Sequence, residues 1–469
     1  MVFVIVCPYF AVSNVSIMTT AMRRLSADPD LFLPSQLLHK KAKELAAIDA
    51  ILVANPAITE AVWKDLQRNK KVTGRPGLSA DQVLRTAIIK QLYSYSYEDL
   101  PFHIADSDTN RRFCYFVSAQ AVPGKSTLAR GIKSIRRDTW HRINRILMGY
   151  ANDKDIEDGK RVRIDPTVTE TNIHPPTDNS LLFDCVRVID RLLCQARAEY
   201  SVLHSSHSRR AKRRHLQIMN APNDARRLRP YKDLLKVTRK TIGYAKAAVA
   251  QLSAHSDARA QSLAAELSHY SELSERVIDQ TERRVLKGES VPAQEKIVSI
   301  GDRQSPIEPH TDVIRKDRRD TYFGHKVTLS GGKSGLVLDW VVEKGNPADS
   351  TLLMPMLDRL TDIYGRVPDQ VSVDGGFASR ENLRLAKEAG VTDMAFAKKR
   401  GLRVEDMTST PAIYRMLRDF RAGIEAIISF LKRSFGMRRC TWQSFASFGG
   451  YVGASIVTAN LLMLARHLT

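Results

Sequence analysis

The pattern of apolar and polar positions predicts a run of helices at the start of the chain. Apolar residues recur at helical spacing in four segments, namely 34–70 with a break at Asn55-Pro56, 79–92, 97–107, and one that begins at Pro123. Ser79 and Gln82 have the spacing of a capping box. The last segment is basic and is expected to carry Arg136 and Arg137. Short helices with a basic final member favour a helix-turn-helix-like DNA-binding region over 23–155, and a plain helical dimerisation module is the alternative.

A strand pattern follows at Arg161–Ile164, where charged and apolar side chains alternate with a period of two. Asp165 comes next and precedes Pro166, which cannot continue a central ladder and is expected to end the strand. A carboxylate at the end of an apolar strand is costly to bury without a counter-charge. A metal ion would supply that charge, so we interpret Asp165 as the first ligand of a two-metal phosphoryl-transfer site.

Helical spacing then returns for a long excursion away from this strand. Thr177 or Asp178 is expected to cap a helix that opens at Leu181, and the segment 242–286 indicates long antiparallel helices. The segment 204–240 is densely basic with few acidic residues, which favours contact with DNA phosphates over a merely solvated face. The residues expected to make this contact are Arg209, Arg210, Lys212, Arg213, Arg214, Arg226 and Arg227.

The chain after residue 320 returns to strands and alternates them with helices. The expected order is a hairpin (322–330 and 336–342), a helix capped by Asp349 or Ser350, a strand ending at Asp374, a helix (380–389), a strand (392–397) and a last long helix. This order predicts an α/β layer architecture with a mixed sheet. Gly375 and Gly376 follow Asp374, and we expect them to let the backbone turn sharply and a bulky substrate approach.

The last of these helices carries Arg421, Glu425 and Lys432 at intervals of four and seven residues. At this spacing the three side chains project within roughly 40° of one another. One face could therefore present a metal-binding carboxylate between two cations that hold phosphates. An ordinary intrahelical ion pair is the alternative, and two upstream aspartates at strand ends favour the functional interpretation.

Composition adds a preference for a polyanionic partner. The chain has 469 residues, enough for about three domains, and a formal net charge of +21. Such an excess favours DNA or RNA as partner over a basic but otherwise ordinary enzyme. Five scattered cysteines are no disulfide framework and fit a reducing cytoplasm. No membrane segment is expected, and residues 1–22 are interpreted as a disordered or mis-assigned start.

In these motifs the chain resembles the DDE transposases of bacterial insertion sequences, in the group often labelled ISNCY. The resemblance runs from about Leu25 to His467 and is strongest at 302–350, 374–379 and 420–425. It implies an RNase H-like catalytic domain in which Asp165, Asp374 and Glu425 bind divalent metal. Related enzymes carry a Tyr-Arg-Glu-Lys signature in the last helix. Arg421, Glu425 and Lys432 match it, but Arg418 stands at the position of the tyrosine.

The resemblance implies a transposase that uses two Mg²⁺ ions, with Mn²⁺ as an alternative ion. Its partners would be double-stranded DNA, namely terminal inverted repeats and target DNA, and it would act as a homodimer in the cytoplasm, at the nucleoid. The expected domains are the helical region 23–155, a catalytic domain formed by 156–190 and 300–469, and a basic helical insertion at 191–299. A non-catalytic regulator or decayed transposase, and a host nuclease on the same fold, are the alternative functions.

Overall fold

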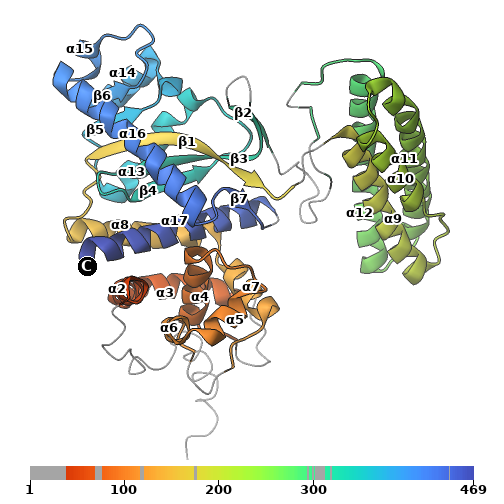
Figure 1. Cartoon of the computed structure of the whole chain (residues 1–469), viewed down its shortest axis with the longest axis horizontal. Coiled ribbons are helices and arrows are strands. Elements are labelled where there is room, and N and C mark those ends of the chain that lie inside the picture. The colour runs from red at the N-terminus through yellow and green to blue at the C-terminus, as the bar shows by residue number, and fades with distance from the viewer. Residues whose placement is uncertain are drawn as a thin grey trace, which may run out of the picture. The chain divides into compact units, whose positions relative to one another are not determined.

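The computed structural model of the protein describes residues 39–68, 77–116, 121–173, 177–292, 295–297, 300, 312–316, 320–442 and 444–469 (Figure 1). Contacts divide these residues into two compact units. The first comprises the described residues up to Thr169 and those from Lys326 onwards, and the second runs from Glu170 to His325. The segment 1–22, for which a disordered or mis-assigned start is predicted, lies outside the described residues.

The first unit begins with the predicted run of helices. They are α2 (Lys40–Ala54), α3 (Pro56–Gln67), α4 (Ala80–Leu92), α5 (Leu100–Asp106), α6 (Asp108–Phe113), α7 (Lys125–Ser134) and α8 (Arg137–Asp153). The predicted capping box is present, since Ser79 accepts from the Gln82 amide and Gln82 accepts from the Ser79 amide. The prediction that Arg136 and Arg137 lie on the basic helix that begins near Pro123, here α7, is wrong. Ile135 is extended and ends α7, so Arg136 becomes the N-cap of α8 and Arg137 its first residue.

The strands form one mixed sheet, as predicted. They are β1 (Arg161–Thr171), β2 (Asp312–Lys316), β3 (Asp320–Gly331), β4 (Val337–Val342), β5 (Gln370–Val373), β6 (Asp393–Phe396) and β7 (Arg439–Cys440). The strand order is β2-β3-β1-β5-β6, with β4 paired to β3 and β7 paired to β1. The β3–β4 hairpin is antiparallel, whereas β1, β5 and β6 run parallel.

The expected end of the first strand at Pro166 is wrong, because β1 continues to Thr171. The ladder with β5 stops at the pair Ile164–Val373, one residue before Asp165. The missing N–H of Pro166 therefore interrupts no bond to β5, and the strand can continue.

Helices η3 (Asp349–Thr351), α13 (Leu353–Tyr364), η4 (Gly375–Phe377), α14 (Arg380–Glu388), α15 (Val404–Met407), α16 (Pro411–Ser434) and α17 (Phe445–Leu468) complete the first unit. Asp349 and Ser350 do not cap α13, because they lie in the 3₁₀ turn η3 and the N-cap is Leu352, which makes no side-chain bond. Helix α16 carries Arg421 and Glu425 and runs across the sheet (Figure 1), but it is not the last helix.

Helix α17 follows α16 and packs beside α8 and against α2 and α4 (Figure 1). By length and composition it could cross a membrane, contrary to the prediction that no such segment is present, but 94% of its apolar window is buried inside the fold. Asn460 fixes it to the sheet, since its side chain accepts from the Val337 amide at 2.9 Å and donates to the Val337 carbonyl at 2.7 Å. The helix therefore forms the core between the N-terminal helices and β4.

The second unit is built on long helices, as the apolar spacing predicts. They are α9 (Asp178–Tyr200), α10 (Ser208–Met219), α11 (Asp224–Leu252) and α12 (Ala258–Thr281), the last continued by a π-helical turn at Glu282–Leu286 (Figure 1). Thr177 caps α9, which is one of the two predicted caps. These helices enclose a hydrophobic core of their own.

Candidate active site

The two predicted aspartates lie next to each other because of the register of two parallel strands. Ile164 of β1 pairs with Val373 of β5, and Asp165 and Asp374 are the residues that follow. Parallel neighbours end at the same edge of a sheet, so the two carboxylates leave the sheet at adjacent positions.

Helix α16 brings the third carboxylate to the same place through Arg421. Its Nη1 lies 3.7 Å from Asp165 Oδ2 and 3.5 Å from Asp374 Oδ1, and its Nη2 lies 2.9 Å from Glu425 Oε1. The Arg421 side chain is only 17% exposed. Three acidic residues that are far apart in the sequence thus converge on one guanidinium.

Three hydrogen bonds hold helix α16 in this position. Two run from side chains of the sheet to carbonyl groups of α16, and one runs from a side chain of α16 to a carbonyl group of the sheet. Arg163 Nη1 donates to the Phe420 carbonyl at 2.9 Å, and Ser372 Oγ donates to the Leu417 carbonyl at 2.7 Å. The Tyr414 hydroxyl donates to the Phe396 carbonyl at 2.9 Å. Each of the strands β1, β5 and β6 is therefore hydrogen-bonded to α16.

Arg163 has a role that the alternating pattern does not indicate. The pattern suggests that charged side chains of β1 face water, but Arg163 is 8% exposed and lies 4.5 Å from the centroid of the Phe420 ring. Burial lowers the pKa of Arg163, although a guanidinium keeps its charge. Gly423 makes this contact possible, because a Cβ at this position would overlap Arg163 Nη1.

Gly375 and Gly376 are needed for close packing rather than for a special backbone turn. Neither has a positive φ, and a Cβ at Gly376 would lie 2.7 Å from Asp349 Oδ2. Asp349 in turn accepts from Lys326 Nζ at 2.9 Å. Lys326 and Asp349 thus support the turn after Asp374. Both lie in the segment on which the resemblance is strongest, but residue spacing alone does not indicate their pairing.

The donor set suits hard divalent cations, because carboxylate oxygens are the ligands that Mg²⁺ and Mn²⁺ prefer. Among the described residues, the three carboxylates do not form a group with all ligand oxygens within 4.8 Å of one another. The Arg421 guanidinium lies between them and supplies the positive charge that this cluster requires. In residue type and in position at the sheet edge the three carboxylates therefore suit a divalent cation, whereas their ligand oxygens are farther apart than binding to one shared ion requires.

Two other residues of the α16 signature lie on the same helix. Lys432 lies about two turns beyond Glu425 and is partly buried. Arg418, at the position of the expected tyrosine, is exposed, and its Nε lies 3.9 Å from Asp419 Oδ1.

The predicted DNA-contacting residues of the second unit fall into two groups. Arg209, Lys212, Arg213 and Arg226 are exposed, and within the described part of the chain no ion pair holds them. Arg210 and Arg214 both bind Asp233, and Arg227 binds Asp224 at 2.8 Å. Acids within the segment therefore neutralise part of the charge that the sequence suggested was unbalanced.

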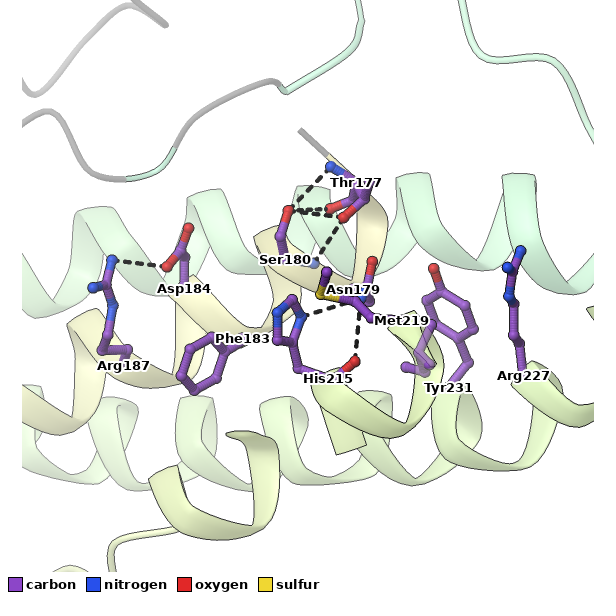
Figure 2. Close-up of a pocket in the computed structure, with 11 residues that line it drawn as sticks. Thr177, Asn179, Ser180, Phe183, Asp184, Arg187, His215, Met219, Arg227 and Tyr231 are labelled. Carbon is purple, nitrogen blue, oxygen red and sulfur yellow. Dashed lines mark hydrogen bonds and ion pairs between the residues drawn. The ribbon is translucent and has the colours of Figure 1, made fainter. Parts of the chain in front are cut away.

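The second unit also contains a cavity of about 720 Å³ beside the start of α9 (Figure 2). Phe183 and His215 stack with ring centroids 5.3 Å apart, and Asn179 holds the His215 ring at 3.1 Å. Arg187 is paired with Asp184 at the edge of the cavity. These lining residues bind one another and belong to the second unit, whereas the three carboxylates belong to the first.

A mixed sheet of this order, with Asp165 and Asp374 on adjacent parallel strands and Glu425 on a helix that crosses the sheet, is the arrangement of an RNase H-like domain. Comparison with known families specifies the class further. Residues 277–461 match the family described as transposase DDE domain, and residues 35–134 match a transposase domain (DUF772). The chain belongs to the DDE transposases of insertion sequences. The same comparisons find no match among curated proteins and none among solved structures.

The matched ranges include Asp374, Glu425 and most of the N-terminal helices, but they leave out Asp165. The family has polynucleotidyl transferase or endonuclease activity, binds DNA and uses divalent metal ions. For Asp165 the support is the pairing of β1 with β5 and the contact with Arg421.

Proposed function

We propose that this transposase binds the terminal inverted repeats of its element and catalyses both cleavage at the element ends and strand transfer into target DNA. The observation that carries the proposal is the convergence of Asp165, Asp374 and Glu425 on Arg421. Two Mg²⁺ ions held by these carboxylates, with Mn²⁺ as a substitute, would activate the attacking oxygen and stabilise the leaving oxygen.

The protein side chains would position the DNA. Arg421 and Lys432 would hold phosphates beside the carboxylates, and the exposed cations of the second unit would track the duplex backbone. Arg136 and Arg137, at the start of α8, would add contacts from the N-terminal region. Water attack would release a 3′-hydroxyl at the element end, and attack of this hydroxyl on target DNA would join the two strands. No covalent bond between protein and DNA is needed.

Two ends must be cut together, so we further propose a homodimer in the DNA complex and action in the cytoplasm, at the nucleoid. In such a dimer each chain would cut one element end, so one set of three carboxylates per chain would be enough to cut both ends.

The test is a cleavage and joining assay on DNA that carries the element ends, with Mg²⁺ or with EDTA. We expect the wild type to yield nicked and joined products with Mg²⁺, and Asp374→Asn to lose at least about a thousandfold in rate, because one metal ligand is replaced by an amide. Asp369→Asn is the matched control, since Asp369 is an exposed carboxylate paired with Arg366 just before β5.

Nicked products without joined ones would identify a nuclease, and end binding without cleavage in any metal would identify a regulator. Either result, or full activity of Asp374→Asn, would contradict the proposal.

A further inference from the structure

A second group of metal-ligating side chains lies within the second unit. Asp190 and Cys194 are four residues apart on α9, so they share one face of the helix. The segment after α9 returns along the helix and places His204 against them. The ligand atoms of the three side chains all lie within 4.8 Å of one another.

The distances within this group match those of a metal site, although the contact between His204 and Cys194 is also short enough for a hydrogen bond to sulfur. His204 Nε2 lies 3.7 Å from Asp190 Oδ1 and 3.7 Å from Cys194 Sγ. Tetrahedral zinc with its usual bond lengths separates a nitrogen from a sulfur by about 3.6 Å and from an oxygen by about 3.4 Å. The nitrogen–oxygen distance is too long for a hydrogen bond.

The polar atoms of this group are oriented but not satisfied. Ser206 and Ser208 each donate a hydroxyl to Asp190 Oδ2 at 2.7 Å, which fixes the carboxylate. Its other oxygen, Oδ1, is buried and has no hydrogen-bond partner. The His204 side chain is 2% exposed and faces this oxygen with Nε2. Buried polar atoms without partners are rare in folded proteins, so the unpaired Oδ1 of Asp190 indicates a place for a cation.

We propose that Asp190, Cys194 and His204 bind one zinc-like divalent cation. Sulfur, nitrogen and oxygen donors together suit Zn²⁺, whereas Mg²⁺ prefers oxygen alone and would not compete. Cys194 is exposed and free, so the metal can enter from this side and a water molecule can complete the tetrahedron. Ser206 and Ser208 are positioning residues that act through Asp190.

The structural consequence is local. The metal ties the segment 201–207 to α9, and this segment leads directly into α10, the helix with Arg209 and Arg213. Binding would thus fix the start of the basic helix independently of the carboxylates of the active site.

The test uses the full-length reduced protein, freed of metal with a chelator and titrated with Co²⁺ as a spectroscopic probe. We expect one Co²⁺ per chain to give the visible bands of tetrahedral cobalt and a thiolate charge-transfer band, both removed by Zn²⁺ but not by Mg²⁺. Cys194→Ser should abolish the charge-transfer band. His204→Ala and Asp190→Asn should weaken binding at least about tenfold, and Ser206→Ala should weaken it by up to about tenfold.

Asp184→Asn and His255→Ala are matched controls, because both residues lie in the second unit but outside the group. Circular dichroism of each variant separates lost binding from lost folding. Octahedral bands without charge transfer, an unchanged spectrum in Cys194→Ser, or equal weakening in the controls would overturn the proposal. None of these outcomes bears on DNA cleavage, so the two proposals fail separately.

Discussion

Arg421 determines the electrostatics of the active site. Three carboxylates at one sheet edge would repel one another, and the guanidinium within 4 Å of each offsets this repulsion. The resemblance of the α16 signature predicts that Arg421 contacts phosphate. In the structure its hydrogen bond goes to Glu425, so an incoming phosphate would share the guanidinium with the carboxylates.

Lys90 provides a prediction about pH at the same scale. It is 6% exposed on α4, and burial lowers its pKa from 10.5 to about 8. Between these values the unfolded chain keeps a proton that the folded chain has lost, so stability rises with pH in this window. We expect Lys90→Met to raise the unfolding free energy at pH 7 by about 2 kcal/mol, and the gain to shrink towards pH 10.5.

Urea unfolding of wild type and variant at pH 7 and pH 10 measures this difference. The control is Lys40→Met, since the Lys40 side chain is 76% exposed and its removal should show no such trend. A gain for Lys90→Met that stays constant over the two pH values would refute the assignment.

At the scale of elements, the active site depends on how α16 docks on the sheet. Hydrogen bonds from Arg163, Ser372 and Tyr414 join the helix to β1, β5 and β6, and Arg421 adds ion pairs with Asp165 and Asp374. Gly423 lies between Phe420 and Glu425 on this helix, at the point where Arg163 approaches. The glycine therefore sets the distance between the helix with Glu425 and the strand with Asp165.

We expect Gly423→Ala to displace Arg163, because the new Cβ would overlap its guanidinium. The bond to the Phe420 carbonyl would be lost, at a cost of about 1–3 kcal/mol in unfolding free energy, and DNA cleavage should slow at least about tenfold. Thermal unfolding and the cleavage assay measure the two effects.

Gly149→Ala is the matched control, since Gly149 lies in α8 with nothing within 4 Å of a Cβ. It should raise stability by up to about 1 kcal/mol through helix propensity alone. If both variants behaved alike, close packing at Gly423 would not be the reason for the glycine.

The sequence predicted most of the elements and pointed to the three carboxylates, because both leave local signals. Alternation and helical spacing predicted the mixed sheet and the helical excursion, and an aspartate after each of two apolar strand patterns singled out Asp165 and Asp374, although β1 continues beyond Asp165. Partners across the fold leave no such signal. The alternation of charged and apolar side chains predicts on which face of β1 Arg163 lies, but it does not indicate that α16 covers this face. Likewise α17 has almost no polar face, because it is buried all round.

At the scale of the whole molecule, only part of the basic side chains behind the net charge of +21 can contact DNA without first leaving an acidic partner. Many arginines are already paired with acids, as Arg384 is with Glu381 and Glu388. Exposed cations without such partners release counterions from DNA when they bind, and they determine how strongly salt weakens the complex.

We expect a variant with Arg209, Lys212, Arg213 and Arg226 replaced by glutamine to bind element ends more weakly at all salt concentrations. The slope of log affinity against log salt concentration should become shallower by about 2 to 4, since each phosphate contact contributes about 0.9. Fluorescence anisotropy over a salt series gives this slope.

A charge-matched control replaces four arginines that the structure pairs with acids, namely Arg259, Arg283, Arg384 and Arg403. Its slope should remain close to that of the wild type. Equal losses of slope in both variants would show that net charge alone, rather than the surface of α10 and α11, governs binding.

The pairing of Ile164 with Val373 has a consequence for synthesis on the ribosome. Strand β1 emerges about 200 residues before β5, and at about 5–20 residues per second it waits roughly 10 to 40 seconds for this partner. The helices of the second unit emerge in that interval and can fold on a core of their own. Strand β3 also emerges before β5 and can pair with the other edge of β1, so a nascent chain stalled before β5 would expose the β5-facing edge of β1, and chaperone binding should fall once β5 is synthesised.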